Sequence, residues 1–138
     1  MTRLGKNWQK NSPSINWYDN IVNLHNKIIE TYGGAKGVID FGLLEATIER
    51  PFRGLADGTE IFPSDIDKAA ALLEGIICFH PFVDGNKRTA TIFAFEFLRE
   101  HGYMIETNDE EIVEFTIRVS VKEVGFPEIK EWIARITK

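Results

Sequence analysis

Residues 64–100 read SDIDKAAALLEGIICFHPFVDGNKRTATIFAFEFLRE, which is two apolar stretches separated by a short polar break. Ser64 is a suitable helix N-cap, and two aspartates follow it in the first turn, where the helix dipole favours acidic residues. The first stretch is apolar on most sides as far as Phe79, so we expect it to form a central buried helix. A second apolar helix is expected over about residues 86–100, where Gly102 stops it.

Four further segments also have helical patterns. From Trp17 onward, apolar residues recur at helical spacing until a Gly-Gly pair at 33–34, which is typical of a C-terminal cap. Capping residues or a first-turn proline mark the starts of the other three, at about Phe41, Asn108 and Pro127. The sequence therefore predicts an all-α fold with about six helices.

The loop before the central helix, residues 52–62, is rich in turn-forming residues. It contains two glycines, one of them in an Asp57-Gly58 pair, which favours a tight turn. We therefore expect a small hairpin-like structure in this loop.

The composition of the chain limits its class. Its 138 residues suit a single core, and we expect one compact domain at residues 17–138 behind a flexible N-terminal arm at residues 1–16. The net charge of -5 argues against a protein that coats nucleic acid, because such binding needs an excess of Lys and Arg. No segment is apolar for long enough to span a membrane.

The single cysteine, Cys78, bears on the cellular compartment. One cysteine cannot form an internal disulfide, and the N-terminal residues contain no apolar stretch suited to export. We therefore expect a cytoplasmic protein. The apolar neighbours of Cys78 indicate a small core residue and not a reactive thiol.

The polar break between the two apolar helices, HPFVDGNKR at residues 80–88, is the candidate active site. It places residues 85–88 at a helix start, where free backbone N–H groups and the positive end of the dipole bind phosphate. Gly85 allows an anion to approach closely, or allows a positive φ angle. Lys87 and Arg88 add side-chain donors for phosphate oxygens.

Two further side chains complete this candidate site. Asp84 is well placed to hold Mg²⁺, which prefers a carboxylate together with phosphate oxygens and water. His80 is the only residue nearby whose side chain exchanges a proton near neutral pH, so it is the natural general base for an attacking hydroxyl. Phe82 is expected to point inward and anchor the loop.

Taken singly, each of these residues has an ordinary structural explanation. A histidine beside a proline is more often structural than catalytic, Asp-Gly-Asn is a common turn, and Lys-Arg at a helix start is commonly a solvated surface. Their concentration in nine residues between two buried helices favours phosphate transfer, which needs a base, a metal ligand and an anion cradle.

The segment HPFVDGNKRTA at residues 80–90 resembles the signature of the Fic/Doc (Fido) superfamily, in the form found in death-on-curing (Doc) toxins. Other segments resemble Doc-type sequences at similar spacing, and the similarity extends over roughly residues 17–138. These segments are Leu24–Ile29, Gly42–Glu45, Arg50-Pro51, Phe62-Pro63 and Lys68–Leu72. The resemblance implies a single compact helical Fic/Doc domain.

The resemblance also implies a role for each motif residue. His80 is then the base that acts on a hydroxyl of a target protein, and Asp84 coordinates Mg²⁺ on the phosphates of the nucleotide. The implied anion hole consists of Gly85, Asn86, Lys87 and Arg88. The family's flap, which holds a target peptide in strand-like pairing, is expected in the loop before the central helix. Its expected residues are Arg53, Gly54, Asp57, Gly58, Thr59, Glu60, Ile61 and Phe62.

Two departures from the pattern of Fic adenylyltransferases, H-P-F-x-[D/E]-G-N-G-R-x-x-R, bear on the reaction. Lys87 replaces the second glycine, and Thr91 stands where the second arginine helps to hold the nucleotide. Both features resemble Doc, although Gly85 is Fic-like where some Doc proteins carry alanine. The resemblance implies a toxin kinase that transfers the γ-phosphate of ATP to a Thr or Ser hydroxyl of a translation factor, elongation factor Tu. The alternative is a Fic-type adenylyltransferase or another nucleotidyl transferase.

Control by a separate antitoxin is the expected arrangement. Autoinhibited Fic proteins carry a Ser/Thr-x-x-x-Glu-Gly/Asn segment, whereas the single Glu-Gly pair here, Glu74-Gly75, has Ala70 at the hydroxyl position. The resemblance thus implies a Phd-like antitoxin with a disordered segment that folds into a groove beside the site. Neither nucleic acid nor a membrane is expected as a partner. A further alternative is a degenerate member of the fold that only binds, in which case His80→Ala leaves any toxicity intact.

Overall fold

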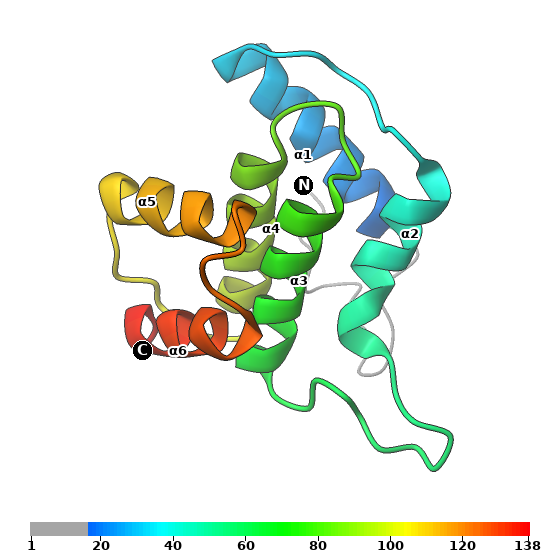
Figure 1. The fold of residues 1–138 in the computed structure, drawn as a ribbon, viewed down its shortest axis with the longest axis vertical. Coiled ribbons are helices and arrows are strands. Elements are labelled where there is room, and N and C mark those ends of the chain that lie inside the picture. Colours follow the sequence, from blue (N-terminus) through cyan, green and yellow to red (C-terminus); the bar gives the residue numbers. More distant parts are fainter. Residues whose placement is uncertain (1–16) are drawn as a thin grey trace.

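The computed structural model describes residues 17–138, and the N-terminal arm expected at residues 1–16 lies outside the described residues. The described chain contains six α-helices and one short 3-10 turn, with α3 and α4 in the middle, α1 and α2 on one side, and α5 and α6 on the other (Figure 1). Their bounds are α1 Trp17–Tyr32, α2 Phe41–Glu49, η2 Arg50–Phe52, α3 Asp65–Phe79, α4 Asn86–Glu100, α5 Asp109–Ser120 and α6 Phe126–Ile136. The predicted all-α fold is confirmed, and every helix starts within one residue of its expected position. None of these helices is both long and apolar enough to cross a membrane.

Helix α3 is the central buried helix that the apolar pattern predicts. Its N-terminal end is a capping box, in which the Ser64 hydroxyl accepts the N–H of Asp67 at 3.0 Å and the Asp67 carboxylate accepts the N–H of Ser64 at 3.2 Å. Residues 69–73 are fully buried, and α3 packs against α2, α4, α5 and α6. Because helices surround it, α3 is a fixed support for the loops at its two ends.

Aromatic side chains fill the core between α1 and α4. Trp17 is fully buried and contacts Phe52, Phe93 and Phe97 edge to face. Burial of a large apolar side chain contributes about 1.5–3 kcal/mol, so the start of α1 is firmly anchored. Cys78 lies half-buried against the same core, and burial raises the pKa of its thiol, as suits a packing role.

The loop between η2 and α3 forms the expected hairpin-like turn. Gly54 and Glu60 pair in an isolated antiparallel bridge. The end of the loop is tied to α3 by the buried Lys68, whose ammonium contacts the Glu60 carboxylate at 2.8 Å and donates to the carbonyl of Phe62. Within residues 17–138 such bridges stay isolated, and no extended strand forms.

Candidate active site

The loop that joins α3 to α4, residues 80–85, is held in place by the segment between α1 and α2. Val38 and Phe82 form an antiparallel bridge, and backbone hydrogen bonds of 2.8 and 3.0 Å on either side of it join residues 37–39 to residues 81–83. In such a pairing the backbone N–H and C=O groups of Val38 point away from the loop. The segment before α2 therefore lies against the predicted motif. The backbone groups on its other edge remain available to hydrogen-bond a further strand.

The predicted flap at residues 53–62 does not lie beside His80. The hairpin precedes α3 and His80 follows it, and this helix of 15 residues is about 22 Å long at 1.5 Å per residue. The two loops thus lie at opposite ends of α3 (Figure 1). The structure therefore does not bring the predicted flap residues to the motif, and the segment that contacts the motif lies between α1 and α2, at residues 35–39. Of the predicted flap residues, Glu60 and Phe62 are half-buried, and the exposed ones are Arg53, Gly54, Asp57, Gly58, Thr59 and Ile61.

His80 is the C-cap of α3 and has left-handed backbone angles, φ 51 and ψ 57, which are uncommon for a residue other than glycine. The residue is exposed, and its Nδ1 lies 3.0 Å from Nδ2 of Asn86. An amide nitrogen can only donate, so Nδ1 carries the lone pair. In the neutral ring the proton therefore lies on Nε2.

Asn86 is buried and holds the loop from the inside. Its amide nitrogen donates to the carbonyl of Phe82 at 2.9 Å, and its Oδ1 accepts the N–H of the same residue at 3.1 Å. These two bonds define which side-chain atom is nitrogen, because the opposite assignment would face oxygen with oxygen. Phe82 is fully buried, as predicted, so the loop is anchored by one apolar and one amide side chain.

Gly85 opens α4 with a φ of 77, in the region that favours glycine. It has no side chain to cap the helix, so the first backbone N–H groups of α4 can bind an anion. A Cβ atom here would lie 3.1 Å from Cδ1 of Ile29. Lys87 and Arg88 are exposed beside these N–H groups, and the guanidinium of Arg88 lies over the ring of Tyr32, 4.2 Å from its centroid.

Asp84 is exposed at the edge of this helix start. The N–H of Ala35 donates to its Oδ2 at 3.0 Å and so orients the carboxylate. Among the described residues, no group of three or more His, Cys, Asp or Glu side chains is placed to hold a metal ion. A single carboxylate nevertheless fits Mg²⁺ that is carried by a nucleotide, because such Mg²⁺ takes one or two carboxylates and fills its other positions with phosphate oxygens and water.

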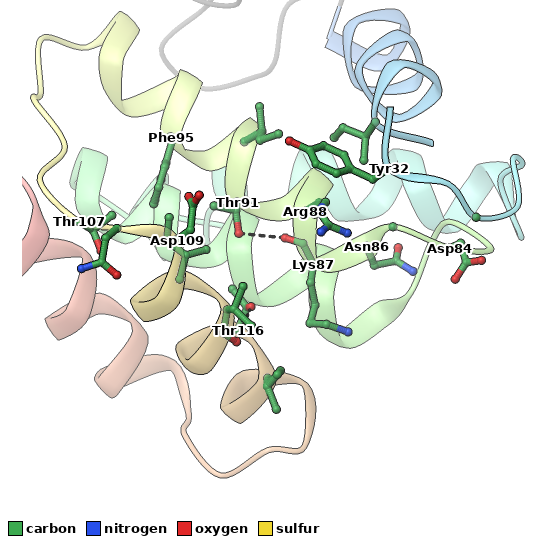
Figure 2. A pocket seen from close by; sticks show the side chains of 18 of the residues that line it. Tyr32, Asp84, Asn86, Lys87, Arg88, Thr91, Phe95, Thr107, Asp109 and Thr116 are labelled. Atoms are coloured by element: carbon green, nitrogen blue, oxygen red, sulfur yellow. Dashed lines mark hydrogen bonds between the residues drawn. The ribbon is translucent and has the colours of Figure 1, made fainter. Parts of the chain in front are cut away.

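A groove of about 910 Å³ opens beside this helix start, between α4, α5 and the end of α1 (Figure 2). Its size is within the range of pockets that bind small ligands. Basic and apolar side chains share its walls, and His80 lies outside the lining. The lining includes Asp84, Lys87, Arg88, Thr91, Phe95 and Arg99.

Three residues contact the site although the sequence does not predict them as site residues. His25 on α1 lies with Nε2 2.6 Å from the carbonyl oxygen of Asp84, the N–H of Ala35 bonds the carboxylate of the same aspartate, and Tyr32 supports Arg88. The helical spacing of α1 indicates that His25 faces inward, but 59 residues separate it from its partner. No local pattern joins residues so far apart.

Together, the fold and the loop define a helical protein in which an uncapped helix start with two exposed cations follows a loop that carries an exposed histidine. The profile of the Fic/DOC family matches residues 15–98, which is more than half of the chain. The chain belongs to the Fic/DOC family.

Two curated relatives are similar to this chain. The protein named Toxin Doc of Mycolicibacterium smegmatis is 43% identical over 74 residues, which are 54% of this chain and 56% of that protein. The protein named Protein kinase doc of Escherichia phage P1 is 29% identical over 120 residues, which are 86% of this chain and 91% of that protein. The match thus spans about half of the first relative and most of the second.

Proposed function

We propose that this protein is a Doc-like toxin kinase that transfers the γ-phosphate of ATP to a Thr or Ser hydroxyl of a protein target. The pair of residues at positions 87 and 91 carries this proposal. Lys87 adds a cation at the helix start, whereas the Thr91 hydroxyl donates to the carbonyl of Lys87 at 2.9 Å (Figure 2). Position 91 thus lacks the arginine that, in Fic adenylyltransferases, helps to hold the nucleotide with its α-phosphate facing the attacking hydroxyl. The similarity to the phage protein named Protein kinase doc supports the same reaction.

The proposed chemistry uses few protein groups. The target hydroxyl gives its proton to His80 and attacks the γ-phosphorus, while the bond from that phosphorus to the β,γ-bridging oxygen breaks and ADP leaves. Nδ1 carries the lone pair of the neutral ring, so it is the atom that accepts this proton. The hydrogen bond from the Asn86 amide to Nδ1 must therefore break as the target binds. The N–H groups at the start of α4, with Lys87 and Arg88, stabilise the charge on the phosphates.

Asp84 is the residue proposed to hold Mg²⁺. Bound together with ATP, this ion would neutralise part of the negative charge on the phosphates. The hydrogen bond from the N–H of Ala35 keeps the carboxylate turned toward the segment before α2, at the edge of the helix start.

The target is proposed to pair with the outer backbone edge of residues 37–39. The N–H and C=O of Val38 point away from residues 81–83 and have no hydrogen-bond partner within the described part of the chain. An extended peptide that adds a strand at this edge would lie beside the loop that carries His80. Elongation factor Tu is the target that the Doc resemblance implies.

A Phd-like antitoxin is the proposed regulator. Val113 and Ile117 on α5 are exposed and line the groove, which gives a folding segment an apolar surface to bury. The similarity to the protein named Toxin Doc supports a toxin role. Expression of the chain alone should arrest growth, and co-expression of a short neighbouring reading frame should relieve the arrest.

Labelled ATP tests the reaction. The protein is incubated with purified elongation factor Tu and Mg²⁺, and with ATP labelled at either the γ- or the α-phosphate. We expect label on the factor from the γ-position alone, and none with His80→Ala. Label from the α-position would instead identify the adenylyltransferase, an alternative that the Fic-like Gly85 supports. Growth arrest that persists in His80→Ala, with no label from either nucleotide, would identify a binding module.

A further inference from the structure

A buried histidine outside the motif contacts the backbone of the motif. His25 on α1 is 1% exposed, and its Nε2 lies 2.6 Å from the carbonyl oxygen of Asp84. A carbonyl can only accept, so Nε2 carries a proton and donates it. Helix α1 thus supplies a fixed donor to the peptide group that joins Asp84 to Gly85.

This hydrogen bond sets the direction of one N–H group. In a planar trans peptide the C=O and N–H point in opposite directions. When His25 holds the carbonyl of Asp84 toward α1, the N–H of Gly85 points away from α1. Gly85 has no Cβ and a φ of 77, so the sterics of its own backbone restrict the rotation of this peptide little. The hydrogen bond from His25 therefore favours one orientation of this peptide.

The imidazole ring also has a packing contact that can be separated from the hydrogen bond. It stacks on the ring of Phe82, with centroids 4.0 Å apart and planes 9° apart. A Cβ on Gly85 would lie 3.6 Å from the Nε2 atom of His25, so ring and backbone are in close contact. A substitution can thus keep the ring and remove the donor, or keep the donor and remove the ring.

We propose that His25 is a positioning residue for phosphate binding: by holding the carbonyl of Asp84, it aims the N–H of Gly85 at the bound phosphate and fixes the backbone from which the Asp84 carboxylate extends. The proposal rests on the proposed function only in taking the phosphate to be that of a nucleotide. Residues that hydrogen-bond to metal ligands have a comparable role, because they orient groups that bind directly. Their loss typically lowers the affinity for the metal about 10–100-fold.

Two variants separate the donor from the ring. His25→Phe keeps an aromatic ring against Phe82 but has no N–H, whereas His25→Gln places an amide N–H near the position of Nε2. We expect the affinity for Mg·ATP, measured by titration calorimetry, to fall about 10–100-fold in His25→Phe and to stay within about threefold in His25→Gln. Thermal unfolding gives the folded fraction of each variant.

The backbone N–H of Gly85 gives a second measurement that does not depend on phosphate transfer. In ¹⁵N-labelled protein, Mg·ATP and inorganic phosphate should each shift the Gly85 amide signal of the wild type and of His25→Gln. In His25→Phe, that shift should be lost at the same ligand concentration. Absence of the shift in the wild type with both ligands would overturn the proposal.

Two other results would also overturn it. One is wild-type affinity for Mg·ATP in His25→Phe. The other is a greater loss in His25→Gln than in His25→Phe, because that order would assign the role of His25 to ring packing. A failure of the kinase proposal looks different: no γ-label reaches a target, while the two variants still differ in phosphate binding at Gly85.

Discussion

Asn86 donates a hydrogen bond of 3.0 Å to Nδ1 of His80, and its other amide proton is bonded to the carbonyl of Phe82 at 2.9 Å. Both protons of the amide are therefore used within the loop. In the protein without ligand, the backbone N–H groups and the cations at the start of α4 are what can receive a phosphate. The side chain of Asn86, which is predicted to be part of the anion hole, also sets the shape of the loop and the tautomer of the neutral histidine.

The first prediction concerns the stability of this loop. Asn86→Ala leaves the buried N–H and C=O of Phe82 without their partners, so we expect the free energy of unfolding to fall by about 1–3 kcal/mol. Lys87→Ala, one position along the same helix but exposed, should change it by no more than about 0.5 kcal/mol. Urea denaturation followed by circular dichroism measures both. Equal effects of the two variants would show that Asn86 does not hold the loop.

The second prediction compares two adjacent glycines. Both have positive φ angles, +89 for Gly33 and +113 for Gly34, so alanine strains the backbone at either position. A Cβ at Gly34 would lie 3.2 Å from Oδ2 of Asp84, whereas a Cβ at Gly33 has no heavy atom within 4 Å. We expect Gly34→Ala to weaken Mg·ATP binding, because the carboxylate must move, and Gly33→Ala to leave it near the wild-type value. Calorimetric titration of both variants tests this, and equal weakening would contradict it.

The third prediction distinguishes the two loops as target sites. Ile39 lies beside the motif and is 61% exposed, and Ile61 lies in the hairpin and is 49% exposed. We expect Ile39→Asp to lower phosphorylation of the target about tenfold or more, which corresponds to about 1.4 kcal/mol, without changing ATP binding. Ile61→Asp is the matched control and should leave both unchanged. If only Ile61→Asp lowered phosphorylation of the target, the target would bind at the hairpin and not at residues 37–39.

The helices could be predicted because their signals are local. Ser64 and Asn108 each cap a helix with their own side chain, three residues from the N–H that they accept. Gly33 ends α1 through a bond from its N–H to the carbonyl of Ile29, within one turn. Such contacts lie inside a short window of sequence, so the residue types reveal them.

The surroundings of the motif could not be predicted in the same way. The partners of Asp84 are His25 and Ala35, which precede it by 59 and 49 residues. These contacts form where α1 packs against α4 and where the segment after α1 pairs with the motif loop. The hairpin at residues 53–62 illustrates the same limit: it is closer to the motif along the chain than residues 35–39 are, but the length of α3 separates it from the motif in space.

The last prediction concerns the choice of phosphate. Lys87→Gly with Thr91→Arg restores the cation pattern of Fic adenylyltransferases at both positions. We expect transfer of the γ-phosphate to fall about tenfold or more. The helix start loses a cation, and the new guanidinium binds the phosphates from position 91 instead of position 87. Thr91→Val is the matched control: it removes a hydroxyl that is bonded only to the carbonyl of Lys87 within its own helix, so transfer should stay within about threefold of the wild type, less than 1 kcal/mol in the barrier. The measurement is target labelling with γ- and α-labelled ATP. If the double variant transfers the γ-phosphate as well as the wild type does, positions 87 and 91 do not determine the reaction.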